Sequence, residues 1–250
     1  MSIIHAFDNA SEEILRPCDI AKPVEGFPKT VIAVFQPKMI EILKTICPVE
    51  EISSMQAVVR IPVYRFSYRD CCLGLYTTMI GGPAAVGLLE EMIVKGTEKV
   101  LVFGAAGVLD RSIAAGHLII PTAACRDEGT SYHYLPESDY IEVPTAAHLG
   151  QIFAELKIPY VTGKIWTTDA IYRETRSAAA KRREEGCIAV DMECASLMAA
   201  GAFRNIPVYQ FVYGEDSLDA AEWDPRSWGC VPASDYEKYL RIALETAIRL

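Results

Sequence analysis

Two acidic residues, Asp191 and Glu193, stand in an otherwise apolar stretch of small residues, AVDMECASLMAAG, at positions 189–201. Burying an unpaired carboxylate is costly unless a partner compensates its charge. Asp191 could cap the N-terminus of a helix, with Glu193 in the first turn, where the helix dipole favours negative charge. Residues 194–200 are weakly polar on every side, as in a buried helix, so the pair could equally form a polar ligand site. The local sequence leaves both interpretations open.

A second acidic pair, Glu215 and Asp216, follows the apolar run 207–213, which is typical of a buried central strand. On its own, this pair is more typical of a solvated acidic loop. Taken together, one acid at the start of a buried helix and another at the end of a buried strand suit cleavage of a glycosidic bond. One carboxylate would accept hydrogen bonds from a ribose diol, which strengthen as the sugar gains oxocarbenium character. The other, kept protonated by partial burial, would donate a proton to the leaving group.

Other common catalytic signatures are absent from the sequence. It contains no GxSxG elbow, Walker A loop, GxGxxG fingerprint or HExxH motif. The four histidines, at 5, 117, 133 and 148, never fall at ligand spacing with one another, so no metal site is expected. The eight cysteines are scattered, without CxxC spacing or a secretory signal, which is typical of reduced thiols in a cytoplasmic protein.

The composition limits the domain organisation and the partners. A chain of 250 residues, 51% of them hydrophobic, can fill one large α/β domain, and no linker or low-complexity run divides it, so residues 1–250 are expected to form a single domain. The net charge of -9 argues against nucleic-acid and membrane-surface partners, which call for clustered lysine and arginine. The longest apolar runs are also too short to span a bilayer. A small-molecule ligand is the expected partner.

Short β-rich runs alternate with helical patterns along the chain, which predicts a layered α/β fold. We expect strands at 31–35, 57–66, 73–79, 99–104, 117–122, 160–166, 188–190 and 207–213, and helices at 38–47, 84–94, 146–156, 176–185 and 236–250. The segment GAAG, residues 104–107, follows the strand at 99–104, and open sheets bind ligands just beyond the carboxyl ends of their strands. Small residues there would let a ligand approach the backbone, although glycine-rich turns are also ordinary in this architecture.

The chain resembles the nucleoside phosphorylase family, which includes purine nucleoside and uridine phosphorylases and the related nucleosidases. The resemblance extends over about residues 31–225 and is carried by TMIGGPAA (78–85), GAAGVL (104–109), AAGHLIIPTAACRDEGTSYHY (114–134), WTTDAIYRE (166–174), VDMECA (190–195) and YGEDSLD (213–219). It implies a three-layer α/β/α sandwich around a mixed, partly closed sheet. It also implies a homo-oligomer (dimer, trimer or hexamer) and chemistry without a cofactor, in which inorganic phosphate is the co-substrate.

Carried over by position, the resemblance implies roles for individual residues. Met192 would pack on the ribose, and Glu193 would bind its 2′ and 3′ hydroxyls. Asp216 matches the acid that protonates a purine at N7, and Arg226 lies in the region where purine members place an arginine that assists this acid. The other substrate contacts implied are Ala105, Ala106, Gly107, Ile171, Tyr172 and Asp191, with His5 of a neighbouring subunit a possible partner for a 5′ hydroxyl.

The departures from the family pattern concern phosphate. The usual first phosphate loop has Gly-Asp-Pro followed two residues later by Arg, whereas this chain has FQPKM at 35–39. A second arginine and a Ser or Thr of the usual site are replaced by Val102 and Ala105. An oxyanion needs charge-assisted donors or a row of backbone amides. Phosphate could still be held by amides near Gly81 and Gly82, by the N-terminus of the following helix, and by Arg60, Lys38 or an arginine of a neighbouring subunit.

Phosphorolysis of a ribonucleoside to free base and ribose 1-phosphate is therefore the expected reaction, and Asp216 tilts the expected substrate toward purines. Uridine phosphorylase activity is a close alternative. Hydrolysis by water, as in the nucleosidases, would suit the loss of the phosphate arginines, and base release unaffected by added phosphate would indicate it. A third interpretation is a ligand-binding or storage protein on a degenerate scaffold, which loss of activity in folded Glu193→Ala and Asp216→Ala variants would exclude.

Overall fold

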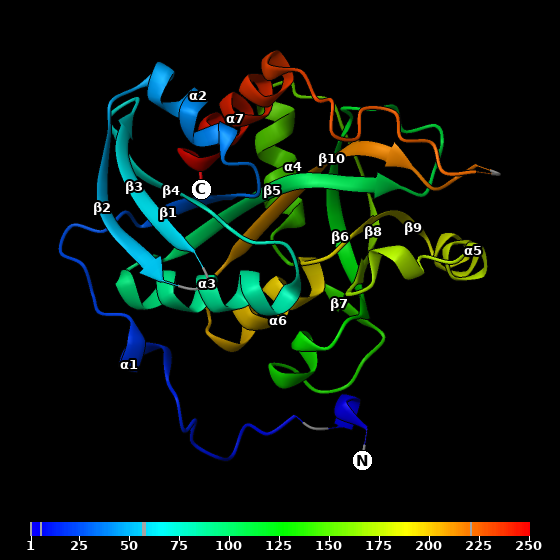
Figure 1. The fold of residues 1–250 in the computed structure, drawn as a ribbon, viewed down its shortest axis with the longest axis horizontal. Coiled ribbons are helices and arrows are strands. Elements are labelled where there is room, and N and C mark those ends of the chain that lie inside the picture. The colour runs from blue at the N-terminus through cyan, green and yellow to red at the C-terminus, as the bar shows by residue number, and fades with distance from the viewer. Residues whose placement is uncertain (1, 6, 57–58, 221) are drawn as a thin grey trace.

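The computed structural model describes residues 2–5, 7–56, 59–220 and 222–250. Strands and helices alternate along the chain, as the sequence pattern predicts (Figure 1). The strands are β1 (Thr30–Val34), β2 (Val49–Gln56), β3 (Arg60–Tyr68), β4 (Cys71–Thr77), β5 (Lys99–Val108), β6 (Leu118–Asp127), β7 (Tyr140–Glu142), β8 (Tyr160–Thr168), β9 (Cys187–Asp191) and β10 (Val208–Ser217). The α-helices are α1 (Pro17–Ile20), α2 (Lys38–Ile46), α3 (Gly82–Lys95), α4 (Ala146–Glu155), α5 (Arg176–Glu184), α6 (Cys194–Phe203) and α7 (Ala233–Ala247), with short 3-10 helices η1 (Ile3–His5), η2 (Thr130–His133) and η3 (Ile171–Arg173).

Within the described part of the chain, the strands form one mixed sheet that closes on itself at one side. Its order is β10-β6-β8-β9-β5-β1-β4-β3-β2, with β7 paired to β6. The closure arises because β10 also pairs with β5, in parallel, so that β5, β9, β8, β6 and β10 form a ring. The remaining strands, β1 to β4, extend from β5 as an open, twisted sheet. The expected mixed, partly closed sheet is thereby confirmed.

Helices cover both faces of the sheet and give the molecule its three layers (Figure 1). Helices α3 and α6 pack together on one face, over a core that includes Val31, Val100 and Val208. Helices α2, α4 and α7 cover the other face, over a core that includes Ile32 and Leu101. Successive strand residues enter opposite cores because strand side chains alternate in direction. The expected α/β/α sandwich is confirmed.

Several strands continue beyond their expected ends, among them β6, which runs to Asp127. GAAG was expected to lie just beyond the end of a strand, but β5 runs through it to Val108, paired with β10 along Ala105↔Tyr213 and Ala106↔Gly214. Likewise β10 continues through the acidic pair to Ser217. Cross-strand pairing overrides the local turn and loop propensities of these residues. The expected strand at 57–66 begins at residues outside the described ones, and the strand found there is β3.

Two further observations bear on the expected partners. Across the described ranges, no helix combines the length and apolar character needed to cross a membrane. Within the same ranges, no group of three or more His, Cys, Asp or Glu side chains is placed to hold a metal ion.

Candidate active site

The first acid, Asp191, ends β9 in a fully buried polar network. Its Oδ1 accepts a hydrogen bond of 2.7 Å from Thr167 Oγ1, and its Oδ2 accepts bonds from Gln210 Nε2 at 3.0 Å and the Cys194 backbone amide at 2.9 Å. The amide of Cys194 is the first of α6, so the Asp191 side chain satisfies a free N–H at the start of this helix, although the N-cap residue is Glu193 and not Asp191 as the capping interpretation had it. Burial raises the pKa of Asp191, and these donors oppose that shift. The predicted contact of Asp191 with substrate stays a prediction, because its carboxylate oxygens are already engaged by the protein.

Glu193 is the N-cap residue of α6, and its side chain contacts another element. Oε1 accepts a hydrogen bond of 2.6 Å from the backbone amide of Gly81, just before α3. The side chain is buried, with 7% of the residue exposed, and burial together with the Asp191 carboxylate raises its pKa. Glu193 thus fits the second interpretation of the opening motif, a polar site at a buried helix start. Met192, predicted to pack on the ribose, is half-buried between these two acids.

A third buried acid, Glu128, was not singled out from the sequence. It accepts hydrogen bonds from the Ser131 amide at 2.9 Å and from the hydroxyls of Ser131 and Ser196. Ser196 in turn lies directly against Gly82, where a Cβ atom would stand only 2.2 Å from Ser196 Oγ. This contact requires glycine at the start of α3, and it fixes the distance between α3 and α6. Sequence reasoning missed Glu128 because the surrounding residues, RDEGTS, are typical of an ordinary polar loop.

The second predicted acid, Asp216, lies in the last part of β10 and is 4% exposed. Its Oδ2 accepts a hydrogen bond of 2.6 Å from Trp223 Nε1, a contact that the sequence did not indicate. Its Oδ1 is buried and has no hydrogen-bond partner among the described residues. Burial raises the pKa of Asp216, while Trp223 and, from further away, Arg226 lower it. A buried carboxyl oxygen without a partner is uncommon and calls for an explanation.

The two acidic segments meet at Gly107. A Cβ placed on this residue would lie 2.9 Å from Val190 Cγ1 and 3.3 Å from Asp216 Oδ1. Gly107 pairs with Val190 of β9, three residues before Glu193, while β10 lies on the other side of β5. The ends of β9 and β10 therefore lie on either side of β5, and the absence of a side chain at Gly107 lets Leu218, Val190 and Asp216 pack closely against its backbone. Of the other predicted β5 contacts, Ala106 is buried and Ala105 is half-buried.

The predicted base contacts Ile171 and Tyr172 lie in η3, after β8. Ile171 is half-buried, whereas Tyr172 is 96% exposed. Arg226 is engaged elsewhere than at the acid it was predicted to assist, because its Nη1 donates to the Ile113 carbonyl at 2.7 Å and its Nε lies 3.5 Å from Asp224 Oδ2. Its effect on Asp216 in this structure is only a longer-range electrostatic one.

The predicted phosphate residues do not converge. Lys38 and Arg60 are exposed, Arg60 forms an ion pair with Glu51, and the Gly81 amide donates to Glu193 instead of remaining available to an anion. The position expected to form the first phosphate loop holds the ring of Phe35. A Cβ on Gly104 would lie 2.6 Å from Phe35 Cδ2, so the ring packs directly on the Gly104 backbone.

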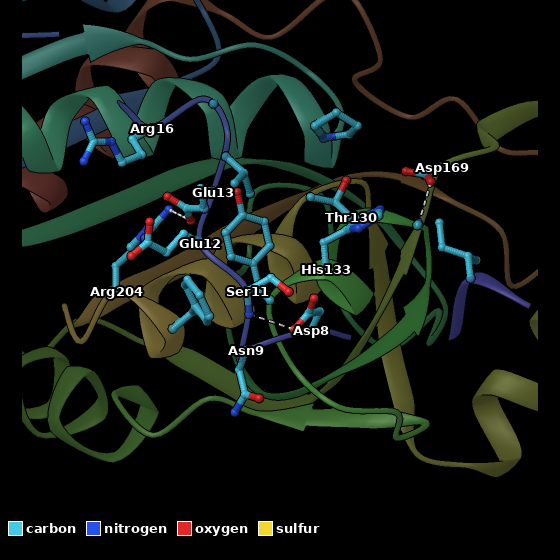
Figure 2. Close-up of a pocket in the computed structure, with 17 residues that line it drawn as sticks. Asp8, Asn9, Ser11, Glu12, Glu13, Arg16, Thr130, His133, Asp169 and Arg204 are labelled. Carbon is cyan, nitrogen blue, oxygen red and sulfur yellow. Dashed lines mark hydrogen bonds and ion pairs between the residues drawn. The ribbon is translucent and has the colours of Figure 1, made fainter. Parts of the chain in front are cut away.

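A cavity of about 980 Å³ adjoins the start of α3. Figure 2 shows it between the N-terminal segment and the body of the protein, with Glu12, Glu13 and Arg204 on one side and Thr130, His133 and Asp169 on the other. Four carboxylates line it, from Asp8, Glu12, Glu13 and Asp169, and its two arginines both form ion pairs with carboxylates. His5, predicted to act in a neighbouring subunit, pairs with Glu137 of its own chain.

Comparisons with known proteins agree with this architecture. The model of the phosphorylase superfamily matches residues 29–229. A guanosine phosphorylase of Halorubrum lacusprofundi is 29% identical over 143 residues, which cover 56% of this chain and 59% of the relative. An uncharacterised protein of Acanthamoeba polyphaga mimivirus is 31% identical over 143 residues, 57% of this chain and 56% of the relative. The chain thus spans a little over half the length of these two relatives.

A solved structure supports the same assignment at the level of the fold. Uridine phosphorylase from Vibrio fischeri superimposes with a TM-score of 0.78 over 98% of this chain and 100% of its own, at 23% identity. The partly closed mixed sheet covered by helices on both faces is thus shared with a solved phosphorylase. The chain belongs to the phosphorylase superfamily.

Proposed function

We propose that this protein cleaves the N-glycosidic bond of a ribonucleoside, with inorganic phosphate as the acceptor of the sugar. The observation that carries the proposal is the unpartnered, buried Oδ1 of Asp216, near the carboxyl end of β10. A carboxyl group with a raised pKa and a free oxygen is suited to donate a proton to a leaving group. The superfamily assignment and the phosphorylase activities named for its relatives support phosphate as the acceptor.

In the proposed reaction, the bond between C1′ and the base nitrogen breaks, and its electron pair passes to the base. Asp216 donates its proton to N7 of a purine, so the base leaves as a neutral molecule, and a phosphate oxygen forms the new bond to C1′. Glu193 Oε1 is held by the Gly81 amide, which leaves Oε2 for the ribose hydroxyls. Hydrogen bonds from these hydroxyls strengthen as positive charge develops on the ring.

The preference for the base is part of the proposal. Asp216 favours a purine, because N7 is a ring nitrogen that can accept its proton. Both a guanosine phosphorylase and a uridine phosphorylase are among the similar proteins, so uridine is the alternative substrate.

We also propose that the 5′ end of the sugar points toward the cavity beside α3. Thr130 and His133 line it and offer hydrogen-bonding groups for a 5′ hydroxyl. Its four carboxylates, against two arginines that are already paired, would repel a 5′ phosphate. The proposed substrate is accordingly a nucleoside and not a nucleotide.

Hydrolysis is the second candidate, and a specific observation favours it. The Phe35 ring lies on Gly104 where the family's first phosphate loop is expected, and Val102 is buried where an arginine is expected. An apolar surface of this kind offers no charge-assisted donor to an oxyanion. If phosphate is the acceptor, the positive charge that binds it would come from Lys38, from Arg60 or from an arginine of a neighbouring copy. We propose that the active form is a homo-oligomer in the cytoplasm.

The test is a panel of purine and pyrimidine nucleosides, each incubated in phosphate-free buffer and again with phosphate, with the free base measured by chromatography. Phosphorolysis predicts base release that depends on phosphate and yields ribose 1-phosphate in equal amount. Base release at the same rate without phosphate, accompanied by free ribose, would establish hydrolysis instead. Absence of base release from every nucleoside would contradict both.

A further inference from the structure

Glu128 is a buried acid that the proposed reaction does not use, and its contacts join elements around the sugar side of the site. It lies between β6 and η2, with 7% of the residue exposed. Its carboxylate accepts hydrogen bonds from the Ser131 amide at 2.9 Å and from the hydroxyls of Ser131 and Ser196. Both serines are fully buried. Glu128 therefore holds η2, which carries Ser131, against α6, which carries Ser196.

Ser196 lies on the same side of α6 as Glu193. It follows Glu193 by three residues, and residues at this spacing are neighbours on the surface of a helix. Glu193 accepts its hydrogen bond of 2.6 Å from the amide of Gly81. Ser196 packs against the next residue, Gly82, where a Cβ would stand 2.9 Å from Ser196 Cβ. The two side chains thus contact consecutive residues at the start of α3.

The Glu128 carboxylate determines the direction of the Ser196 hydroxyl, which donates to its Oε2. A serine hydroxyl inside a helix that lacks such an acceptor turns to a backbone carbonyl of the preceding turn. Ser196 Oγ would then leave its place against Gly82. Because Gly82 directly follows Gly81, a shift of Gly82 would change the direction of the amide that holds Glu193 Oε1.

Glu128 also holds the residues on the 5′ side of the sugar. Thr130 and His133 belong to η2 and line the cavity beside α3 (Figure 2). A Cβ on Gly82 would lie 3.1 Å from Thr130 Oγ1, so η2 reaches the start of α3 as well. Ser131 Oγ accepts a hydrogen bond of 2.8 Å from Nε of the buried Arg126, which ties η2 to β6. Polar groups that are satisfied in this way form a rigid network.

We propose that Glu128 is a positioning residue, which orients Glu193 toward the ribose hydroxyls through Ser196 and the start of α3, and which holds η2 at the 5′ side. This inference rests on the proposed function. A small displacement of a group that contacts the reacting sugar lowers the rate strongly, because productive geometry is lost. The effect should depend on the sugar, since ribose presents a 2′ hydroxyl to Glu193 and 2′-deoxyribose does not.

The test measures kcat and KM by base release for wild type, Glu128→Ala, Glu128→Gln and Ser196→Ala. Each protein is assayed with the ribonucleoside that the wild type prefers and with its 2′-deoxy counterpart. Thr246→Val is the matched control, because it removes a hydroxyl that is as deeply buried as that of Ser196 but lies in α7, on the opposite face of the sheet. Denaturant unfolding reports the stability of every variant.

We expect Ser196→Ala and Glu128→Ala to lower kcat/KM about 10-fold with the ribonucleoside and about two-fold with the 2′-deoxynucleoside, mainly through kcat. Glu128→Gln should recover part of the loss, because its amide oxygen can still accept from Ser196. Thr246→Val should leave the ratio of the two kcat/KM values unchanged. A purely structural role would lower both values by the same factor, so an unchanged ratio in Ser196→Ala would overturn the proposal.

A second measurement adds Ser196→Ala to Glu193→Ala. If Ser196 acts through Glu193, the added substitution should not change the ratio between the two sugars any further. A further fall as large as that in the wild-type background would overturn the proposal. If wild type binds nucleosides without cleaving them, the proposed function fails alone, and the same ratios of dissociation constants, measured by quenching of tryptophan fluorescence, decide the role of Glu128. If it binds none, both fail.

Discussion

The acids at the ends of β9 and β10 are buried to nearly the same degree, but their surroundings differ. Asp191 is 6% exposed, and three donors from Thr167, Gln210 and the α6 amide engage it. Asp216 is 4% exposed, and only Trp223 donates to it, leaving Oδ1 unpartnered. Burial alone therefore does not separate an acid that the protein fully engages from one that has an oxygen free for a substrate. The completeness of the hydrogen bonding does, because an acid that is already satisfied has no oxygen left for a substrate.

The largest expected effect comes from Glu193, the acid on the β9 side whose second oxygen remains for the sugar. Glu193→Ala should lower kcat/KM by about 100- to 1000-fold, because hydrogen bonds that strengthen in the transition state supply several kcal/mol in glycoside cleavage. Steady-state base release checks the loss. With a 2′-deoxynucleoside the same substitution should lower kcat/KM by a smaller factor. An equal loss with ribose and deoxyribose substrates would show that Glu193 does not bind the ribose hydroxyls.

Asp191→Ala sharpens the comparison from the structural side. The substitution leaves the Thr167 hydroxyl, the Gln210 amide and the Cys194 N–H without an acceptor in a buried region, so we expect a loss of about 2–4 kcal/mol in the free energy of unfolding. Denaturant unfolding measures it. By contrast, Asp216→Asn should leave stability unchanged or raise it. Equal stability of Asp191→Ala and Asp216→Asn would contradict the difference drawn between the two acids.

The pH dependence of stability tests the unpaired acids near β10. Glu174 has a pKa raised from about 4.5 to about 7, so between these values the folded protein holds a proton that the unfolded chain releases. Its contribution to stability is therefore present at low pH and is lost as the pH rises from about 4.5 through 7. Glu174→Gln should be more stable than wild type at pH 8 by about 1–2 kcal/mol, and this advantage should vanish near pH 4. Thermal unfolding of both proteins across this pH range measures the difference in stability. A difference that stays constant with pH would argue against a raised pKa of Glu174.

The smallest expected effect concerns Trp223. Its indole N–H lowers the pKa of Asp216, so Trp223→Phe should raise that pKa. An acid that acts in its protonated form then stays active to higher pH, and the alkaline limb of the kcat/KM profile should move upward by a fraction of a unit. We expect a change of only a few-fold in kcat/KM at neutral pH. A downward shift of the limb would contradict the direction of this contact.

The sequence predicted much of the fold because its signals were local or were carried by the family resemblance. Proline and glycine punctuation placed α2 and α3 within about two residues, and the resemblance supplied the partly closed sheet. The continuation of β5 through Gly107 depends on pairing with β10, which no local pattern reveals. For the same reason the contact of Trp223 with Asp216, and the position of Phe35 on Gly104, were not predicted. Both join residues whose proximity is set by tertiary packing.

The predicted site shows the same division. Asp191 and Glu193 were recognised because acids in an apolar segment need an explanation, and Asp216 because it was considered together with them and matches the family resemblance, while Glu174 in a polar loop did not stand out. Their contacts with substrate stay predictions, as do those of Met192, Ile171 and Tyr172. The predicted phosphate residues Lys38, Arg60 and Gly81 show the limit of reasoning by residue type. A cation or a backbone amide can already be engaged by an acid of the protein, as Arg60 is by Glu51 and the Gly81 amide is by Glu193.

The central claim, that Asp216 is the proton donor to the leaving base, is tested most directly by Asp216→Asn with inosine and with 7-methylinosine. The methylated base already carries a positive charge at the ring nitrogen, so it needs no proton to leave. We expect the substitution to lower kcat for inosine by about 100-fold or more and to change kcat for 7-methylinosine by no more than about three-fold. Equal losses on the two nucleosides would contradict the account.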